Sequence, residues 1–242
     1  MSDICLVIGA SGGIGRELVS QLSDSGAEVV AVSRNGFRDD AWPDSVTNVK
    51  CDSQDESQIE NVVNDMASSG QSVSFAVCTV GMLHSESEGK QIQPEKQLES
   101  LNSEQLSAYF TVNTIIPSLW LKHLVGVMSD SAVIACLSAR VGSISDNRLG
   151  GWYGYRASKA ALNMMVKTAA IEYGRRAKGT ALVCYHPGTV DTALSEPFQS
   201  NVKPEKLFTP EFTVSQLLSI TRNLDPKEGP FYLDWDGKPI NW

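Results

Sequence analysis

Seven short apolar segments recur along the chain, each bounded by turn residues. They are apolar throughout instead of alternating with polar residues, which is typical of strands buried on both faces of a parallel sheet. Segments of helical length separate most of them, with apolar spacing such as Ile14, Leu18 and Leu22. The predicted strands are Ile4–Ile8, Glu28–Ser33, Asn48–Cys51, Ser74–Thr79, Ala132–Leu137, Thr180–Tyr185 and Pro230–Asp234. Strands that alternate with helices predict a doubly wound α/β fold, a seven-stranded parallel sheet with helices on both faces.

Two segments stand out from this alternation. The stretch from Leu83 to Asn102 is long and polar, but strongly periodic sequence follows it, so it predicts a surface excursion and not a domain boundary. We therefore expect a single domain over residues 1–242. The helix predicted from Tyr155 to about Arg175 is the longest and has a broad apolar face. That face fits either subunit packing or burial against the chain's own sheet.

The composition excludes several classes of protein. The hydrophobic fraction of 42% and the charged fraction of 20% are ordinary for a globular chain. No segment approaches the roughly eighteen consecutive apolar residues that a membrane helix needs. The net charge is -8 and the basic residues are scattered, so no phosphate-backbone footprint is evident. We expect neither nucleic acid nor membrane as a partner.

The cysteines and histidines indicate neither a disulfide framework nor a metal site. The five cysteines are widely spaced in short apolar runs and form no C-x-x-C pair, so free buried thiols and a reducing cytoplasm are expected. His84, His123 and His186 lack ligand spacing. The opening segment has no basic region and only about six apolar residues, which favours a first strand over a signal peptide.

A glycine-rich turn, GASGGIG, follows the first predicted strand and leads into a helix. Gly9, Gly13 and Gly15 are spaced G-x-x-x-G-x-G, and Ser11 and Ile14 lie between them. Glycines permit a tight turn and close approach to a pyrophosphate, which the helix N-terminus attracts. The Lys and Ser or Thr of a nucleotide-hydrolysing P-loop are absent. A glycine cluster can be a plain turn, but its place between strand and helix favours dinucleotide binding and a Rossmann fold.

The end of the second predicted strand bears on which dinucleotide is bound. A protein selective for NAD places a carboxylate there, on the adenine ribose. This chain has Ser33 and Arg34 instead, and a guanidinium suits a 2′-phosphate. NADP is therefore predicted over NAD. The alternative is that Arg34 is a solvated loop residue with Asp39 and Asp40 as neighbours.

Tyr155 and Lys159 lie four residues apart at the start of the long helix, so their side chains share one face. A positive charge beside a phenol favours the phenolate, so Tyr155 could exchange a proton with a substrate oxygen near neutral pH. Such a pair suits carbonyl and alcohol chemistry. The spacing alone is a weak signal, because it arises easily by chance.

The whole chain resembles the short-chain dehydrogenase/reductase superfamily. The matches, in family order, are GASGGIG at 9–15, Asp52 after the third strand, TVNT around Asn113, YRASK at 155–159 and PGTVDT at 187–192. GGWYGYRASKAALN, HPGTVDTALSEPF and YLDWDGKPINW look most similar to the C-factor and sniffer-like carbonyl reductase subgroup.

This resemblance implies roles for individual residues. Tyr155 would be the general acid or base, and Lys159 would lower its pKa and hold the nicotinamide ribose. Asn113 would kink its helix and anchor a proton-relay water. The residues implied in cofactor binding are Asp52 and Ser53 at the adenine, Val80 and Gly81 after the fourth strand, and Pro187, Gly188, Val190 and Thr192 at the nicotinamide. Simpler interpretations are a surface polar residue for Asn113, a turn for Pro187–Gly188 and a helix cap for Asp52.

The chain departs from the family pattern at the substrate-binding serine, which usually lies three residues before a glycine. Here the sequence is LSARVGS, and counting back from Gly142 gives Ala139. A shift of one residue in a strand turns the side chain to the other face. Three alternatives remain: a bulge restores Ser138, Ser143 substitutes for it, or Tyr155 and water hold the substrate oxygen alone. Ser138 is slightly favoured.

The long interval after the serine position is expected to border the substrate pocket. It holds Arg140, Arg148 and Trp152. With apolar residues of neighbouring loops, namely Met82, Leu83, Tyr153, Leu194 and Phe198, it predicts an apolar pocket with one or two cationic residues at its rim.

These features predict an NADP-dependent oxidoreductase that transfers a hydride between the nicotinamide and a carbonyl or alcohol substrate, with reduction the favoured direction. The alternative is a weakly catalytic or non-catalytic cofactor-binding protein with a signalling or scaffold role, of the C-factor type. A nucleotide-sugar epimerase is disfavoured, because 242 residues leave no room for its larger carboxy-terminal domain. The resemblance also implies a homodimer or homotetramer.

Overall fold

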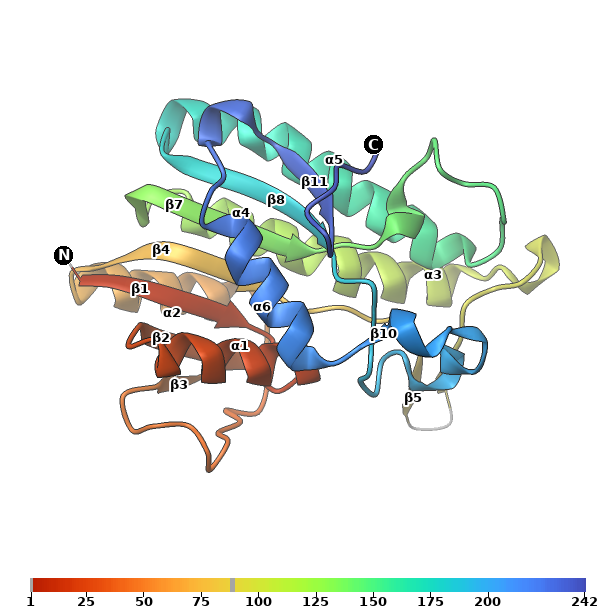
Figure 1. Cartoon of the computed structure of the whole chain (residues 1–242), viewed down its shortest axis with the longest axis horizontal. Helices are drawn as coiled ribbons and strands as arrows, with labels where there is room; N and C mark the ends of the chain where they lie inside the picture. The colour runs from red at the N-terminus through yellow and green to blue at the C-terminus, as the bar shows by residue number, and fades with distance from the viewer. Residues whose placement is uncertain (1, 88–89) are drawn as a thin grey trace.

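A computed structural model describes residues 2–87 and 90–242 of the chain and contains the predicted parallel sheet (Figure 1). Its strands are β1 (Ser2–Ile8), β2 (Glu28–Ser33), β3 (Thr47–Lys50), β4 (Gln71–Cys78), β7 (Met128–Leu137), β8 (Thr180–His186) and β11 (Phe231–Asp234). They are paired in the order β11-β8-β7-β4-β1-β2-β3, and every pair is parallel. The predicted doubly wound fold is confirmed. The strand order reverses between β1 and β4, which is where such sheets bind ligands.

Helices cover both faces of this sheet. On one face lie α1 (Gly13–Asp24) and α6 (Pro210–Thr221), which contact each other. On the other lie α2 (Glu56–Ser68), α4 (Ile116–Leu124) and α5 (Tyr153–Arg176), and α3 (Ser103–Phe110) packs against α5. The apolar face of α5 is therefore buried against its own sheet along part of its length. Two small ribbons complete the fold, β5 (Ser85–Ser87) with β6 (Lys90–Ile92) and β9 (Thr189–Val190) with β10 (Leu207–Phe208).

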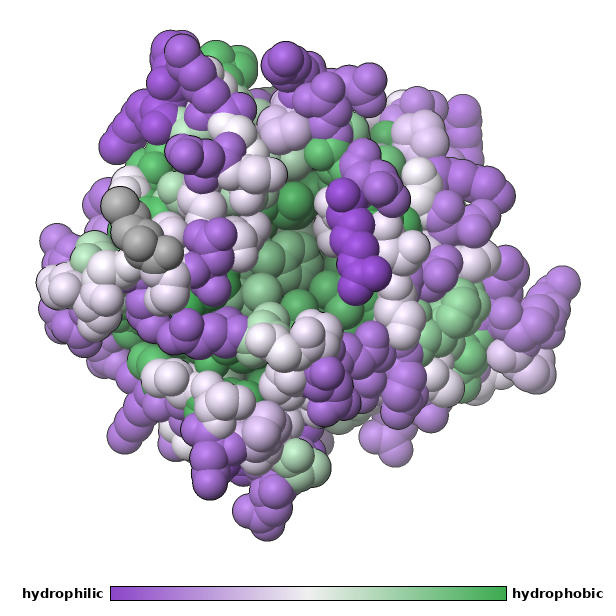
Figure 2. Space-filling view, turned by 60° about the vertical axis from the view of Figure 1, so that its left-hand side comes forward, coloured by the Kyte–Doolittle hydropathy of each residue, from purple (hydrophilic) through white to green (hydrophobic). Residues whose placement is uncertain are grey.

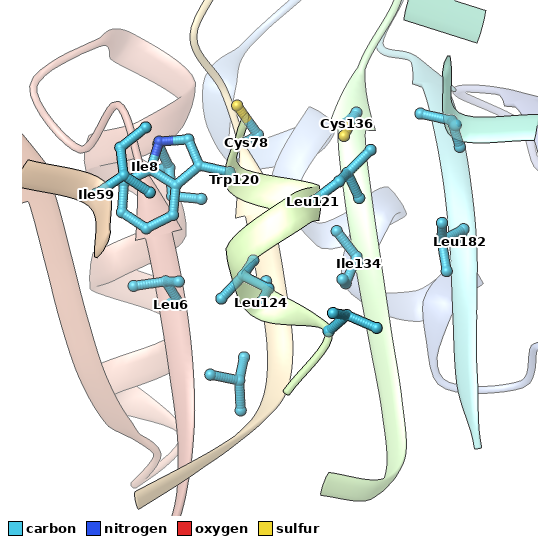
Figure 3. Close-up of a cluster of buried hydrophobic side chains, with 14 of the residues drawn as sticks. Leu6, Ile8, Ile59, Cys78, Trp120, Leu121, Leu124, Ile134, Cys136 and Leu182 are labelled. Atoms are coloured by element: carbon cyan, nitrogen blue, oxygen red, sulfur yellow. The ribbon is translucent and has the colours of Figure 1, made fainter. Parts of the chain in front are cut away.

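Two hydrophobic cores hold these layers together. Between the sheet and α2, α4 and α5, the indole of Trp120 lies against Ile8 and Ile59 (Figure 3). Its Nε1 donates a hydrogen bond to Ser53 Oγ at 3.1 Å, which satisfies the polar atom of a fully buried side chain. On the other face, Leu18 and Val19 of α1 pack with Leu217 of α6. The strands are buried on both sides, as their unbroken apolar runs require.

The polar excursion is only partly a surface feature. Its β5–β6 hairpin is short and antiparallel, and residues 88 and 89 lie outside the described residues. Beyond the hairpin, Pro94 and Glu95 are buried, and Glu95 lies against the start of α5. The excursion therefore packs beside the helix that carries Tyr155 and Lys159.

A hollow of mixed polar and apolar lining opens at the edge of the sheet where the strands begin (Figure 2). It has a volume of about 440 Å³, and its lining includes Cys5, Phe75, Val133, Leu218, Leu224 and Pro226. No residue predicted from the sequence to be functional lines it. In the part of the chain that the structure describes, no helix is both long enough and apolar enough to cross a membrane.

The glycine turn gives a test of the fold. A Cβ at Gly15 would overlap the Gly9 carbonyl oxygen and lie 3.0 Å from Ala10 Cα, whereas one at Gly12 would lie 3.6 Å from Gly9 O, an ordinary contact. Gly15→Ala should therefore lower the free energy of unfolding by about 1–3 kcal/mol, and Gly12→Ala by less than about 1 kcal/mol. Thermal unfolding of the two variants measures this. Equal melting temperatures would contradict the packing of α1 on this turn.

Candidate functional site

A groove runs along the edge of the sheet where the parallel strands end. It consists of two cavities, of about 310 Å³ and about 340 Å³, that share Thr79, Val80 and Gly81 as lining residues. These three residues follow β4 at the topological switch point. The cavity of about 310 Å³, called the outer cavity, is lined by the predicted cofactor residues Gly9, Ser11, Ser33, Arg34, Asp52 and Ser53. The cavity of about 340 Å³, called the inner cavity, is lined by Ile14, Ser138, Tyr155, Lys159, Pro187, Gly188, Val190 and Thr192.

The glycine turn lies where the two cavities meet. Gly9 has φ +90°, and its Cα faces Thr79 so closely that any side chain would collide with it. At Gly13, a Cβ would lie 2.7 Å from the methyl group of Thr192, so residues 187–192 pack against the glycine turn. Among the described residues, no side chain caps α1, whose N-cap is Gly12. Its first N–H groups and its positive end are therefore available to a phosphate.

The residues after β2 and β3 line the outer cavity. Ser33 Oγ accepts a hydrogen bond from Phe37 N at 2.7 Å, so this hydroxyl shapes the turn that carries the exposed Arg34. Asp52 Oδ1 accepts from Gln54 N at 3.1 Å. The N-cap of α2 is Asp55, so the helix-cap interpretation of Asp52 is wrong.

Arg16 brings a second guanidinium to the same region. It lies 4.1 Å above the centre of the Phe37 ring, and its Nε donates to Ser11 O at 3.2 Å. Arg16 was not predicted as a cofactor residue, because nothing in a linear sequence shows that the first turn of α1 faces the turn after β2.

Asn113 is fully buried in a π-helical turn, Thr111–Ile115, that separates α3 from α4. The predicted irregularity of its helix is present, and the surface interpretation of Asn113 is wrong. Its Oδ1 accepts from Met82 N at 2.8 Å, while its Nδ2 donates to Met82 O at 2.9 Å and to Ser158 Oγ at 3.1 Å. Asn113 therefore fixes the segment after β4 to the first turns of α5. It lines neither cavity.

Lys159 projects from α5 into the interior, where its Nζ donates to Leu137 O at 2.8 Å. A Cβ on Gly81 would lie 3.5 Å from this Nζ and 3.6 Å from Asn113 Oδ1, so all three groups converge.

The surroundings of Lys159 are apolar. Cys78, Cys136 and Cys184 lie side by side on β4, β7 and β8 and belong to the core nearby. Burial lowers the pKa of Lys159 to about 8.

Tyr155 is buried at the wall of the inner cavity. Its ring makes edge contacts with Tyr109 and Trp152, with ring centres 6.2 Å and 6.1 Å away. Burial, followed by the nearby Tyr232, raises the pKa of Tyr155, although Lys159 Nζ lies 5.8 Å from the centre of its ring. The expectation that Lys159 lowers this pKa is not met in this structure, because desolvation of the phenolate dominates. The Tyr155 hydroxyl therefore keeps its proton at neutral pH.

Ala139, which follows β7, belongs to the same small apolar cluster as Tyr155. Ser138 lines the cavity, but its hydroxyl donates to Asn163 Oδ1 at 2.6 Å. Ser143 Oγ accepts from Asp146 N at 3.2 Å within its own loop and lines neither cavity. Of the alternatives left open by the sequence, this geometry favours the one in which no serine touches the substrate oxygen.

Pro187, Gly188, Val190 and Thr192 form the opposite wall. Gly188 has φ +77°, and any side chain there would collide with the Phe208 ring, so the turn after β8 admits only glycine. His186 precedes it and also lines the cavity. Burial, followed by Arg140, lowers the pKa of His186 to about 4, so its imidazole is neutral at pH 7. Nothing in the sequence indicated that His186 lies in this cavity, because the spacing of the histidines indicated only that they form no metal site.

The cavity is largely apolar at its open end. Its lining there includes Leu83, Val141, Trp152, Leu194, Phe198 and Val202. The one guanidinium in the lining, Arg140, is bound to Asp234 at 2.8 Å and lies 3.6 Å from Asp146. Met82 and Tyr153, predicted in this pocket, do not line it. Among residues 2–87 and 90–242, no three His, Cys, Asp or Glu side chains are arranged to hold a metal ion.

Comparison with protein families identifies residues 3–203 as a match to the short chain dehydrogenase family. One relative, the 1-hydroxy-2-glutathionyl-2-methyl-3-butene dehydrogenase of Rhodococcus sp. (strain AD45), is 25% identical over 98% of each chain. The C-signal of Myxococcus xanthus is 30% identical over 55% of this chain and 76% of its own. An NADPH-bound carbonyl reductase from chicken fatty liver superposes with a TM-score of 0.80 at 23% identity, covering 100% of this chain and 99% of its own.

The buried ammonium of Lys159 predicts a pH-dependent stability. Its pKa is lower in the folded chain than the usual 10.5, so protonated Lys159 destabilises the fold below pH 8, and this penalty disappears as the pH rises from about 8 to 10.5. Lys159→Met should raise the free energy of unfolding at pH 7 by roughly 1–2 kcal/mol, the relieved penalty being partly offset by an unpaired Leu137 carbonyl. Urea unfolding between pH 7 and 10 should show this gain shrinking. A variant that is less stable at every pH would contradict the prediction.

Proposed function

Because this chain belongs to the short-chain dehydrogenase family and is an oxidoreductase of that family, we propose that it reduces an apolar aldehyde or ketone with NADPH. The single observation that carries the proposal is the placement of Tyr155 and Lys159 in the wall of the cavity that joins the glycine turn. Its apolar open end suits an uncharged carbonyl compound, because the lining arginine is already paired with Asp234.

The residues present fit a dinucleotide phosphate. The uncapped start of α1 and the close glycine contacts suit the pyrophosphate, Asp52 and Ser53 the adenine, and Arg34 a 2′-phosphate. The carbonyl reductase from chicken fatty liver carries NADPH on the same fold. When bound, NADPH supplies the hydride. No carboxylate ends β2, which is why NADP(H) is preferred to NAD(H).

The chain's own residues would supply the proton and orient the substrate. Tyr155 is protonated at neutral pH and would donate its hydroxyl proton to the carbonyl oxygen, which suits reduction. Lys159, with a pKa near 8, would hold the ribose, and Asn113 would keep the segment after β4 in place. The Ser138 hydroxyl donates its proton to Asn163, so in this arrangement it does not donate to the substrate oxygen. We propose that Tyr155 acts with water and without a serine.

A second candidate is the cofactor-binding signalling or scaffold protein of the C-factor type. The observation that favours it is the 30% identity to the C-signal of Myxococcus xanthus, together with Ala139 in place of a serine. A chain that binds NADPH but reduces no carbonyl compound would support this candidate. The five free cysteines fit a reducing cytoplasm for either function.

Arg34 should decide between the two nucleotides. Arg34→Ala removes a charge-assisted hydrogen bond to the 2′-phosphate, so the Kd for NADPH should rise roughly 10- to 100-fold while that for NADH changes less than about threefold. Energy transfer from tryptophan to the nicotinamide measures both. Arg175→Ala, an exposed arginine in the last turn of α5, is the control and should change neither. Equal losses for both nucleotides would argue against the 2′-phosphate contact.

Tyr155 should be required for turnover but not for binding. Tyr155→Phe keeps the ring between Tyr109 and Trp152 and removes only the hydroxyl, so kcat should fall about 10²- to 10⁴-fold with the NADPH Kd nearly unchanged. Steady-state rates over a panel of apolar aldehydes and ketones test this. Ser138→Ala should keep kcat within about threefold. A loss as large as that of Tyr155→Phe would restore Ser138 to the catalytic set.

We also propose that the chain is a homodimer or homotetramer. Met164, Met165 and Ile171 are exposed on α5, and Ile171 is 66% exposed, so the outer side of this helix is apolar and available to a second copy of the chain. Light scattering coupled to size-exclusion chromatography should show a dimer or tetramer that Ile171→Glu shifts toward monomer. A monomeric wild-type chain would overturn this proposal.

A further inference from the structure

Glu95 is a buried side chain that is distant in sequence from the glycine turn and from the Tyr155–Lys159 pair. Its side chain belongs to the polar excursion, yet the residue is only 2% exposed. Burying an ionised carboxylate is unfavourable unless it is paired or hydrogen-bonded. The start of α5 provides a partner for one of its oxygens, Oε2, whereas Oε1 has no hydrogen-bond partner among the described residues.

Two hydrogen bonds attach Glu95 to this helix. Its Oε2 accepts from Gly154 N at 3.0 Å, and its carbonyl oxygen accepts from Trp152 N at 2.5 Å. The N-cap residue Trp152 provides no side-chain cap for α5. A side chain 59 positions away in sequence takes over this task by accepting a hydrogen bond from the first turn of the helix.

The backbone at this junction is constrained. Trp152 has φ +53° and is the one non-glycine residue with positive φ among those described. A bulky residue in this region is strained by about 1–3 kcal/mol, so the surrounding contacts must hold it. The bond from Trp152 N to Glu95 O is one of them. Gly154 is also confined, because a Cβ there would lie 2.9 Å from Glu95 Oε1 and would collide with the Tyr109 ring.

Glu95 holds the backbone of Trp152 and Gly154, and the two rings that touch Tyr155 are that of Trp152 itself and that of Tyr109, which packs against Gly154. The Trp152 ring meets Tyr155 edge-on at an interplanar angle of 75°, and the Tyr109 ring does so at 65°. Trp152 also contacts Phe198 across the cavity, with ring centres 5.4 Å apart. A movement of the first turn of α5 would therefore displace both rings and the Tyr155 hydroxyl.

We propose that Glu95 is a positioning residue that sets the orientation of Tyr155 for proton donation, acting through the start of α5, Trp152 and Tyr109. This inference rests on the proposed carbonyl reductase function. The hydrogen-bond acceptor matters in this role and the negative charge does not, because the contacts to Tyr155 are made by rings. Glu95 itself touches neither substrate nor cofactor.

Four variants test the proposal in the full chain. Glu95→Ala removes the acceptor, Glu95→Asp keeps the charge but shortens the reach, and Glu95→Gln keeps the reach without the charge. Glu99→Ala, an exposed glutamate of the same excursion, is the matched control. We expect kcat to fall at least tenfold in Glu95→Ala and Glu95→Asp, with the Kd for NADPH within twofold of wild type. Glu95→Gln should recover kcat to within threefold, and Glu99→Ala should match wild type.

Two kinetic results would overturn the proposal. One is an unchanged kcat in both Glu95→Ala and Glu95→Asp. The other is a parallel loss of NADPH binding, which would indicate general unfolding and not misplacement of Tyr155. If Glu95→Ala does not fold, the comparison of Glu95→Asp with Glu95→Gln still decides, because each keeps a polar group at the buried position.

A second readout separates this proposal from the proposed function. In protein labelled with 3-fluorotyrosine, the Tyr155 ¹⁹F resonance is identified by its loss in Tyr155→Phe. It should shift in Glu95→Asp and return toward the wild-type position in Glu95→Gln. If the wild-type chain reduces no carbonyl compound, the reductase function fails while this shift still reports on positioning of Tyr155. An unshifted resonance would overturn the role of Glu95.

Discussion

The hydrogen bond from Lys159 Nζ to the Leu137 carbonyl joins the longest helix to the middle of the sheet at the edge where the strands end. An ammonium group is difficult to bury, so every element around it must be small or polar at the point of contact. Gly81 approaches from the segment after β4, and a side chain on Gly142 would collide with the backbone of Lys159. Cysteines occupy the neighbouring positions on three adjacent strands. The glycines and small side chains of this region are thus consequences of one buried charge.

The same burial sets the chemistry available at the cavity. A site that excludes water raises the pKa of Tyr155 and lowers that of Lys159, so the phenol keeps its proton and the amine is close to neutral at moderately alkaline pH. This is the starting state needed by an acid that protonates a developing alkoxide. The same burial makes protonated Lys159 unfavourable for the stability of the fold. The neutral His186 and the paired Arg140 add no further free positive charge to that of Lys159 in the cavity wall.

Most of the strands could be predicted from the sequence because they contain unbroken apolar runs, and the glycine turn because it follows one such run directly. The edge strand β3, TNVK, is the weakest of these patterns. Asn113 and the Tyr155–Lys159 pair were identified by spacing and by resemblance to a family. Glu95 could not be found this way, since a glutamate in a polar stretch looks like any solvated charge until the excursion is folded against α5. The direction of the Tyr155 pKa shift was also wrong. The sequence shows that a lysine lies near Tyr155, but it does not show how deeply the phenol is buried. The burial raises the pKa of Tyr155 more than the lysine lowers it. The substitution of Ala139 for a serine was visible in the sequence, but the bond between Ser138 and Asn163 required the structure.

Transfer of a labelled hydride tests the central claim most directly. NADPH that carries deuterium on one face of its nicotinamide C4 is offered with an apolar ketone, and in a parallel reaction the label is on the other face. Mass spectrometry of the alcohol then reports the label. We predict one deuterium on the carbinol carbon from one labelled form and none from the other, because the walls of the cavity fix the face that is presented. An alcohol without deuterium from either form, or no alcohol at all, would contradict direct hydride transfer in this cavity.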